Sequence, residues 1–125
     1  MIEIVSTANA PAALGPYIQA IKTNGFIYCS GQIPINPASN AVEAVSIEDQ
    51  TRQAITNLKN VLEAAGSSLA NVVKTTVFIK DMNDFVALNG VYAEMFGDTK
   101  PARSCVEVAR LPKDVKVEIE AIAVC

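Results

Sequence analysis

The spacing of apolar residues alternates along the chain between the two-residue period of strands and the period of about 3.6 residues typical of helices. Alternating or β-branched runs predict six strands, at residues 2–5, 17–22, 26–30, 72–79, 105–111 and 115–124. Asn24-Gly25 lies between the second and third runs. This pair predicts a tight hairpin, because both central residues of a type I′ turn have positive φ.

Helical spacing dominates two other segments. The first begins at Ser46, a good N-cap, and ends at Gly66, a residue type favoured just after a helix. The second begins near Asp81 or Asn83, either of which can cap it, and ends at Gly97. No repeat, low-complexity tract or linker interrupts this order. We therefore expect a single α+β domain over residues 1–125, with two helices on one face of a mixed six-stranded sheet.

The last predicted strand has two different faces. One face is entirely apolar and suits a layer of helices: Val115, Val117, Ile119, Ala121 and Ala123. The other face mixes charged and apolar residues: Lys116, Glu118, Glu120, Ile122 and Val124. Such a mixture is unusual on a fully solvated face and equally unusual in the core of a monomer. An interface between subunits that contains a polar pocket accounts for both kinds of residue.

Composition excludes several classes of protein. The chain contains no histidine, so it cannot form a Ser-His-Asp triad, a Cys-His pair or a histidine-ligated metal site. Its formal net charge is -3 and its basic residues are scattered, which argues against nucleic acid as a partner. Cys29, Cys105 and Cys125 are widely spaced, so we expect reduced thiols. No apolar run reaches the roughly 18 residues that span a membrane, and no signal peptide is recognisable, so we expect a cytoplasmic protein.

Arg103 and Glu118 are the first candidates for chemistry. Arg103 lies between Pro101-Ala102 and an apolar strand, where a loop can present its guanidinium to a carboxylate, although an ordinary surface arginine fits the same position. Glu118 lies in the last strand, where apolar neighbours raise the pKa of a carboxyl group towards neutrality. An interface salt bridge is the alternative for Glu118. Alternation puts Glu118 and Glu120 on one face and does not decide between them.

Four further residues carry weaker signals. Tyr17 opens a predicted strand after Gly15-Pro16, so its ring can line a cleft or close an edge of the core. Ser30 and Gly31 offer a hydroxyl and a closely approaching backbone, but such a pair is also ordinary turn chemistry. Cys105 is close to Arg103 in sequence, yet no histidine is present to act as its base. A buried structural cysteine is therefore the better interpretation of Cys105.

A series of motifs runs through nearly the whole chain. They are Asn9-Ala10-Pro11, Gly15-Pro16-Tyr17, Ser30-Gly31-Gln32-Ile33-Pro34, Asn57-Leu58 through Ala65-Gly66, Lys74-Thr75-Thr76-Val77, Asn89, Tyr92, Pro101-Ala102-Arg103-Ser104-Cys105-Val106-Glu107-Val108, Arg110-Leu111-Pro112 and Val117-Glu118-Ile119-Glu120-Ala121. In this order they resemble the reactive intermediate deaminase (RidA) family. The resemblance implies a chorismate-mutase-like fold, in which three chains form a trimer with a central barrel of sheets and with helices outside.

The same resemblance implies an activity and a site. Relatives of this kind hydrolyse 2-iminobutanoate and 2-iminopropanoate, or their enamine tautomers, to 2-oxo acids and ammonia, without cofactor or metal. Pyridoxal-phosphate-dependent dehydratases release these intermediates. By resemblance, Arg103 binds the substrate carboxylate and Glu118 positions or activates the attacking water. The residues expected to line this site between subunits are Tyr17, Ser30, Gly31, Asn89, Arg103 and Cys105.

Two other functions fit parts of the sequence. A trimer with carboxylate-sized clefts can serve as a regulatory module that binds 2-oxo acids without turning them over. An RNA-cleaving or translation-inhibiting protein is the second alternative, and the acidic balance and missing histidine argue against it. The sequence does not determine the preferred imino acid, nor the dehydratase that supplies it.

Overall fold

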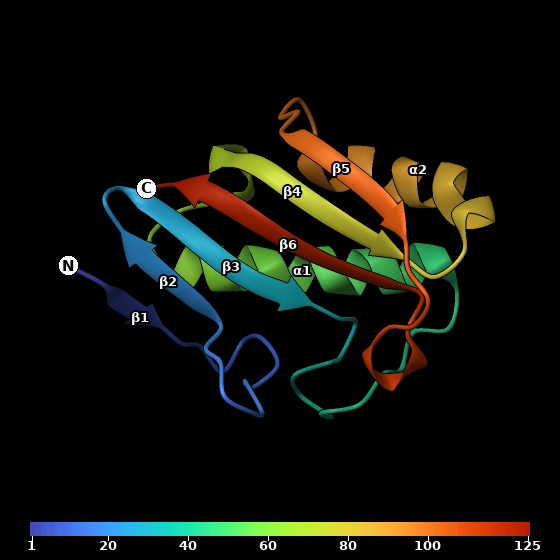
Figure 1. Ribbon diagram of the computed structural model, residues 1–125, viewed down its shortest axis with the longest axis horizontal. Helices are drawn as coiled ribbons and strands as arrows, with labels where there is room; N and C mark the ends of the chain where they lie inside the picture. Colours follow the sequence, from blue (N-terminus) through green and yellow to red (C-terminus); the bar gives the residue numbers. More distant parts are fainter.

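The computed structural model describes residues 1–125 and is built around one six-stranded sheet (Figure 1). Its strands are β1 (Glu3–Val5), β2 (Ala20–Thr23), β3 (Phe26–Gln32), β4 (Val72–Ile79), β5 (Ala102–Glu107) and β6 (Val117–Val124). Its two α-helices are α1 (Ile47–Ala64) and α2 (Phe85–Phe96). Short 3-10 helices cover Leu69–Asn71, Met82–Asp84 and Pro112–Asp114.

The strand order in the sheet is β1-β2-β3-β6-β4-β5. All neighbouring strands are antiparallel except β4 and β5, which are parallel. A parallel pair needs a crossover connection, and α2 supplies it. Both helices pack on the same side of the sheet and against each other (Figure 1). The predicted α+β architecture, a mixed six-stranded sheet with two helices on one face, is confirmed.

The hydrophobic core lies between the helices and the sheet. From α1 it takes Ala54, Ile55, Leu58, Val61 and Leu62, all fully buried. The apolar face predicted for the last strand is buried throughout: Val115, Val117, Ile119, Ala121 and Ala123. We call the opposite side of the sheet, which no helix covers, the open face. Neither helix is both long enough and apolar enough to cross a membrane.

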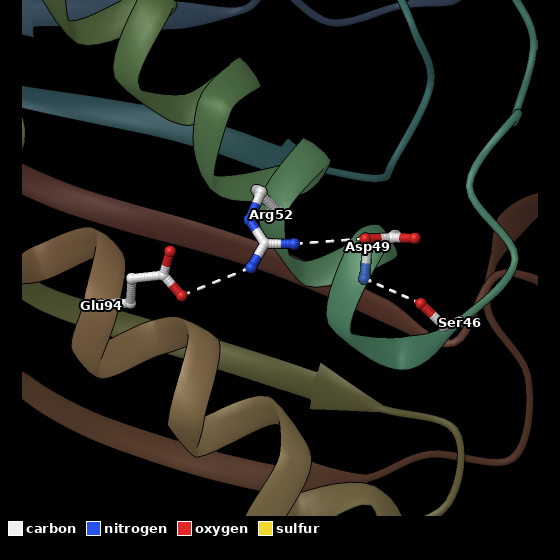
Figure 2. A network of polar contacts seen from close by, with 4 residues as sticks. All are labelled: Ser46, Asp49, Arg52 and Glu94. Atoms are coloured by element: carbon white, nitrogen blue, oxygen red, sulfur yellow. Dashed lines mark hydrogen bonds and ion pairs between the residues drawn. The ribbon is translucent and has the colours of Figure 1, made fainter.

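The start of α1 is fixed by local polar contacts that also reach α2 (Figure 2). The Ser46 hydroxyl accepts a hydrogen bond of 3.1 Å from the Asp49 backbone N–H, which confirms Ser46 as the N-cap. Arg52 forms an ion pair of 3.2 Å with Asp49 and another of 3.3 Å with Glu94 of α2. These exposed pairs are worth only about 0.2–1 kcal/mol each, but the pair with Glu94 links the two helices.

The turn signals are confirmed, whereas several element boundaries predicted from the sequence are wrong. The fifth strand ends at Glu107 rather than at residue 111, the third continues to Gln32 rather than ending at residue 30, and the sixth begins at Val117 rather than at residue 115. Asn24 and Gly25 both have positive φ, as a type I′ hairpin requires. The fifth strand begins at Ala102 rather than at residue 105, because the parallel ladder starts where Ala102 pairs with Lys74. The second strand begins at Ala20 rather than at residue 17, since the chain is still in a turn at Tyr17, whose N–H donates to the Gly15 carbonyl.

Another wrong boundary is the start of the second helix. The Asp81 carboxylate accepts a hydrogen bond of 2.9 Å from the Asn83 N–H, and in doing so it caps the 3-10 helix Met82–Asp84. The α-helix itself begins only at Phe85, and its N-cap residue, Asp84, makes no side-chain capping bond. Asp81 therefore caps the 3-10 turn that leads into α2 rather than α2 itself. Gly97 ends the helix, as predicted.

Candidate functional site

Arg103 is held in place by three side chains of α2. Its guanidinium donates a hydrogen bond of 2.7 Å from Nη1 to the Asn89 side-chain oxygen. The guanidinium carbon lies 4.8 Å from the centre of the Tyr92 ring and 5.4 Å from that of Phe85. Contacts of this kind orient a guanidinium by cation–π attraction. Arg103 is thus a half-buried, oriented residue of strand β5 rather than a free surface arginine on a loop.

A buried hydrogen bond fixes the Tyr92 ring beneath the guanidinium. The Tyr92 and Thr75 hydroxyl oxygens are 2.7 Å apart, and both residues are buried. Thr75 lies directly beside Arg103 in the β4–β5 ladder. Burial raises the pKa of Tyr92, and the Thr75 hydrogen bond and the charge of Arg103 oppose that rise. Sequence reasoning did not assign this pair a role, although both residues belong to the motifs that carried the family resemblance.

Glu118 occupies the open face of the sheet. It pairs with Phe78 of β4, whereas the buried Ala121 pairs with Thr75, so Glu118 points away from the helices. Burial is the main cause that raises the pKa of Glu118, and the neighbouring charge of Glu120 raises it further. Glu118 is half-buried while Glu120 is exposed. A carboxyl group with a raised pKa is suited to exchange protons with water or substrate.

Gly31 of β3 lies directly against the Glu118 side chain. A Cβ atom built on Gly31 would overlap the Glu118 carboxyl oxygen Oε2, and would lie 2.9 Å from its carboxyl carbon and 3.1 Å from its Cγ. The φ angle of Gly31 is not positive, so the turn does not explain this glycine. The explanation is space, because the Glu118 carboxylate can lie here only if residue 31 has no side chain. The structure therefore brings together two residues that the sequence had singled out separately.

The remaining candidates differ in whether their polar groups are free to contact a ligand. The Ser30 hydroxyl donates a hydrogen bond of 2.6 Å to the Ile18 carbonyl. Tyr17 is half-exposed and lines a shallow depression of about 760 Å³ with Tyr28 and Ser30. Burial raises the pKa of the Cys105 thiol, and the nearby charge of Arg103 only partly opposes the effect. A catalytic thiolate at Cys105 is therefore disfavoured on electrostatic grounds.

The candidates fall into two groups on opposite faces of the sheet. Arg103 and Cys105 pair with Thr75 and Val77, so they share the face that α2 covers. Glu118, together with the Gly31 backbone it touches, belongs to the open face. A single chain therefore does not bring its guanidinium and its half-buried carboxylate to one small molecule. The sequence could not reveal this separation, because it follows from the register of strands that are far apart along the chain.

Comparison with known proteins identifies the family. The model of the family described as Endoribonuclease L-PSP matches residues 7–125, and the chain belongs to this family. A RutC family protein from Pyrococcus horikoshii is 58% identical over 123 residues, which cover 98% of each chain. A 2-iminobutanoate/2-iminopropanoate deaminase from Escherichia coli is 54% identical over 127 residues, covering 99% of this chain and 98% of that protein. These relatives confirm the resemblance to RidA drawn from the motifs.

A solved structure agrees with the fold. Escherichia coli TdcF with bound serine superposes with a TM-score of 0.95 at 46% identity, and 98% of each chain is covered. The fold is thus that of a known relative which binds a small amino acid.

Proposed function

We propose that this chain is a cytoplasmic 2-iminobutanoate/2-iminopropanoate deaminase that works without a cofactor. The observation that carries the proposal is the Arg103 clamp, in which Asn89, Tyr92 and Phe85 orient a guanidinium that can still donate hydrogen bonds to a carboxylate. The deaminase from Escherichia coli, 54% identical over almost the whole chain, supports this activity. The substrates would be short 2-imino acids released by pyridoxal-phosphate-dependent dehydratases.

The active site of this proposal is shared between two copies of the chain. Arg103 and Glu118 face away from each other in one chain, so a substrate that meets both needs Arg103 from one copy and Glu118 from the next. The open face carries exposed apolar side chains, among them Phe26, Tyr28 and Val106, that a second copy would cover. We propose a homotrimer of the chorismate-mutase-like kind, with its sites between adjacent subunits.

In the proposed mechanism, Arg103 anchors the substrate carboxylate and so places the imine carbon near Glu118. Glu118 accepts a proton from a water molecule as the water oxygen bonds to the imine carbon and the C=N π electrons move to nitrogen. Glu118 returns this proton to the nitrogen, which gives a carbinolamine. The carbinolamine hydroxyl then passes its proton through Glu118 to the nitrogen, so that the oxygen forms the C=O bond as the C–N bond breaks, releasing ammonia and leaving a 2-oxo acid. An imine carbon is already electrophilic, so the reaction requires neither a covalent nucleophile nor a Lewis acid. Tyr17, Ser30 and Gly31 would line the site from the Glu118 side, and Asn89 and Cys105 from the Arg103 side.

The direct test measures product formation from freshly generated imine. A threonine dehydratase supplies 2-iminobutanoate, and the rate of ammonia and 2-oxobutanoate release is compared with and without this protein. We expect a clear acceleration that scales with protein concentration. An unchanged rate from folded protein that still binds 2-oxobutanoate would favour a regulatory 2-oxo-acid-binding module instead. Salt-sensitive cleavage of RNA, without deamination, would favour the activity named in the family description.

The Tyr92 ring provides a test of the clamp. Tyr92→Phe should lower the free energy of unfolding by about 1–3 kcal/mol, because the Thr75 hydroxyl would remain buried without its partner. Its KM should stay close to the original value, since the ring over Arg103 is kept. Tyr92→Leu should raise KM about two- to tenfold above that of Tyr92→Phe, because it also removes the cation–π contact. Urea unfolding and steady-state kinetics measure both effects, and equal KM values for the two variants would contradict a role for the ring.

Gly31 provides a test of the position of Glu118. Gly31→Ala should lower kcat by about tenfold or more, because the new methyl group displaces the Glu118 carboxylate. Stability should change less, since the group that must move is the end of a flexible side chain. The matched control is Gly90→Ala in α2, where a Cβ meets nothing within 4 Å, and this variant should keep full activity. Normal turnover by Gly31→Ala would show that the contact with Glu118 does not matter.

A further inference from the structure

A second cavity lies between three loops at the end of β3, and we call it the loop pocket. Its lining residues are Pro11, Ala12, Leu14, Tyr17, Gln19, Gly31, Gln32, Ile33, Ile35, Asn40, Pro112 and Lys113. Its volume is about 210 Å³, well above the roughly 10–15 Å³ that one water molecule requires. Neither Arg103 nor Glu118 lines it, although it shares Gly31 and Tyr17 with the candidate site. β3 and β5 are three positions apart in the sheet, so Arg103 of the same chain lies roughly 14 Å away or more.

Two walls of the loop pocket are held by buried amide side chains. The Gln19 amide donates hydrogen bonds to the carbonyls of Thr7 and Pro11, at 3.0 and 2.8 Å, and its oxygen accepts one of 2.7 Å from the Thr7 N–H. The Asn57 amide of α1 donates to the carbonyls of Ile33 and Ile35, at 3.1 and 2.9 Å. These contacts fix the segments on both sides of the cavity, so its shape is already formed before any ligand binds.

The third wall of the loop pocket is formed by the segment around Lys113, whose unfavourable backbone conformation is maintained by contacts with neighbouring residues. Lys113 and Asp114 both have left-handed backbones, with φ of 55° and 54°. Each such residue costs free energy and persists only where its surroundings impose it. Lys80 forms an ion pair of 2.8 Å with Asp114, and the Lys116 N–H donates a hydrogen bond of 2.8 Å to the buried Gln50 side chain. These contacts hold Lys113 at the edge of the loop pocket.

Two polar side chains of the loop pocket, Gln32 and Lys113, have no partner within the chain. Gln32 is only 5% exposed, it lines the cavity, and its carboxamide forms no hydrogen bond with the protein. The Gln32 amide atoms are not fully buried, since the Thr51 hydroxyl is the only buried side-chain polar atom without a partner, so they remain accessible to a group inside the cavity. Lys113 is the only charged residue that lines the cavity, and it takes part in no ion pair. The rest of the lining is mostly aliphatic.

We propose that the loop pocket binds a small aliphatic carboxylate, independently of the Arg103 site. The Lys113 ammonium and the Gln32 amide N–H would bind the carboxylate, and the short chain would lie against Leu14, Ile33 and Ile35. The volume leaves room for a small acid such as butanoate or 2-oxobutanoate. Because Gly31 and Tyr17 border both places, an acid bound here can influence the position of Glu118.

Calorimetric titration of Arg103→Ala with butanoate tests the proposal, because that variant lacks the other carboxylate anchor. We expect one bound butanoate per chain, and at least about tenfold weaker binding of butanamide, which has the same shape without the charge. Lys113→Gln in the same background should weaken butanoate about tenfold, whereas Lys59→Gln on the outer side of α1 should not. Failure of Arg103→Ala to bind butanoate, or equal affinity for acid and amide, would overturn the proposal.

A second measurement identifies the place of binding. The side-chain NH₂ resonances of Gln32 should shift on titration with butanoate, and those of Asn71, whose amide donates to the Ser67 hydroxyl and which does not line the pocket, should not. Calorimetric titration of Gln32→Leu with butanoate should show loss of binding if that variant folds. If it does not fold, Lys113→Gln provides the test. A titration that leaves the Gln32 resonances unmoved would indicate that water alone fills the cavity. None of these outcomes depends on turnover, so they are separate from the test of deaminase activity.

Discussion

Arg103→Ala should lower kcat/KM for 2-iminobutanoate by roughly 30-fold to several thousand-fold, the largest loss expected from any single change. Removing one partner of a desolvated charge pair costs about 2–5 kcal/mol, and each 1.4 kcal/mol is a factor of ten. Most of the loss should appear in KM if the guanidinium binds substrate and transition state equally. Steady-state rates of ammonia release give both constants.

Two controls separate substrate binding from folding in this experiment. Arg52→Ala removes another arginine, one that forms exposed pairs with Asp49 of α1 and Glu94 of α2, and it should keep nearly full activity. Arg103→Lys keeps the charge but cannot form two parallel hydrogen bonds, so it should recover only part of the loss. Unimpaired turnover by folded Arg103→Ala would remove the proposed anchor.

Glu118→Gln should lower kcat by about 100-fold or more, because an amide cannot accept the proton of the attacking water. The unmodified protein should lose activity at acid pH, with a midpoint above 4.5, since burial and Glu120 raise the pKa of Glu118 above that ordinary value. Glu120→Gln should move this midpoint to lower pH but not back to 4.5, because burial is the larger cause. A pH–rate profile unchanged by Glu118→Gln would assign the proton transfer to another group.

The same pKa shift predicts the direction of a stability change. The folded protein holds the Glu118 proton more tightly than the unfolded chain does. Stability contributed by Glu118 should therefore be highest below the unfolded pKa and decline as pH rises through the folded pKa. Glu118→Gln should remove this part of the pH dependence. Urea denaturation of the two proteins at a series of pH values, from acid to neutral, compares them directly.

Mixing two inactive variants tests whether the site is shared between copies. Co-expressed Arg103→Ala and Glu118→Gln chains assemble at random. A site regains both native residues when a Glu118→Gln chain supplies its Arg103 and the neighbouring Arg103→Ala chain supplies its Glu118. This arrangement should restore roughly a quarter of the original activity. Sites contained within single chains would give no recovery at all.

Most of the secondary structure could be predicted from the sequence because its signals are local. Ser46 caps α1, Gly97 ends α2, and Asn24-Gly25 turns the β2–β3 hairpin through contacts within a few residues. The start of β5 was misplaced for the opposite reason. Its first residues are not apolar enough to indicate a strand, and their conformation is imposed by pairing with β4, about 28 residues earlier in the chain.

The sequence by itself determined the order of elements, the apolar face of β6, the exclusion of histidine chemistry and the names of the candidate residues. Only the tertiary structure decided how those candidates are arranged. The register of β4 with β5 and β6 turns Arg103 towards α2 and Glu118 towards the open face, and it brings Glu118 against Gly31. The physical reason is that alternation along one strand is a local property, whereas the pairing of distant strands depends on the packing of the whole core.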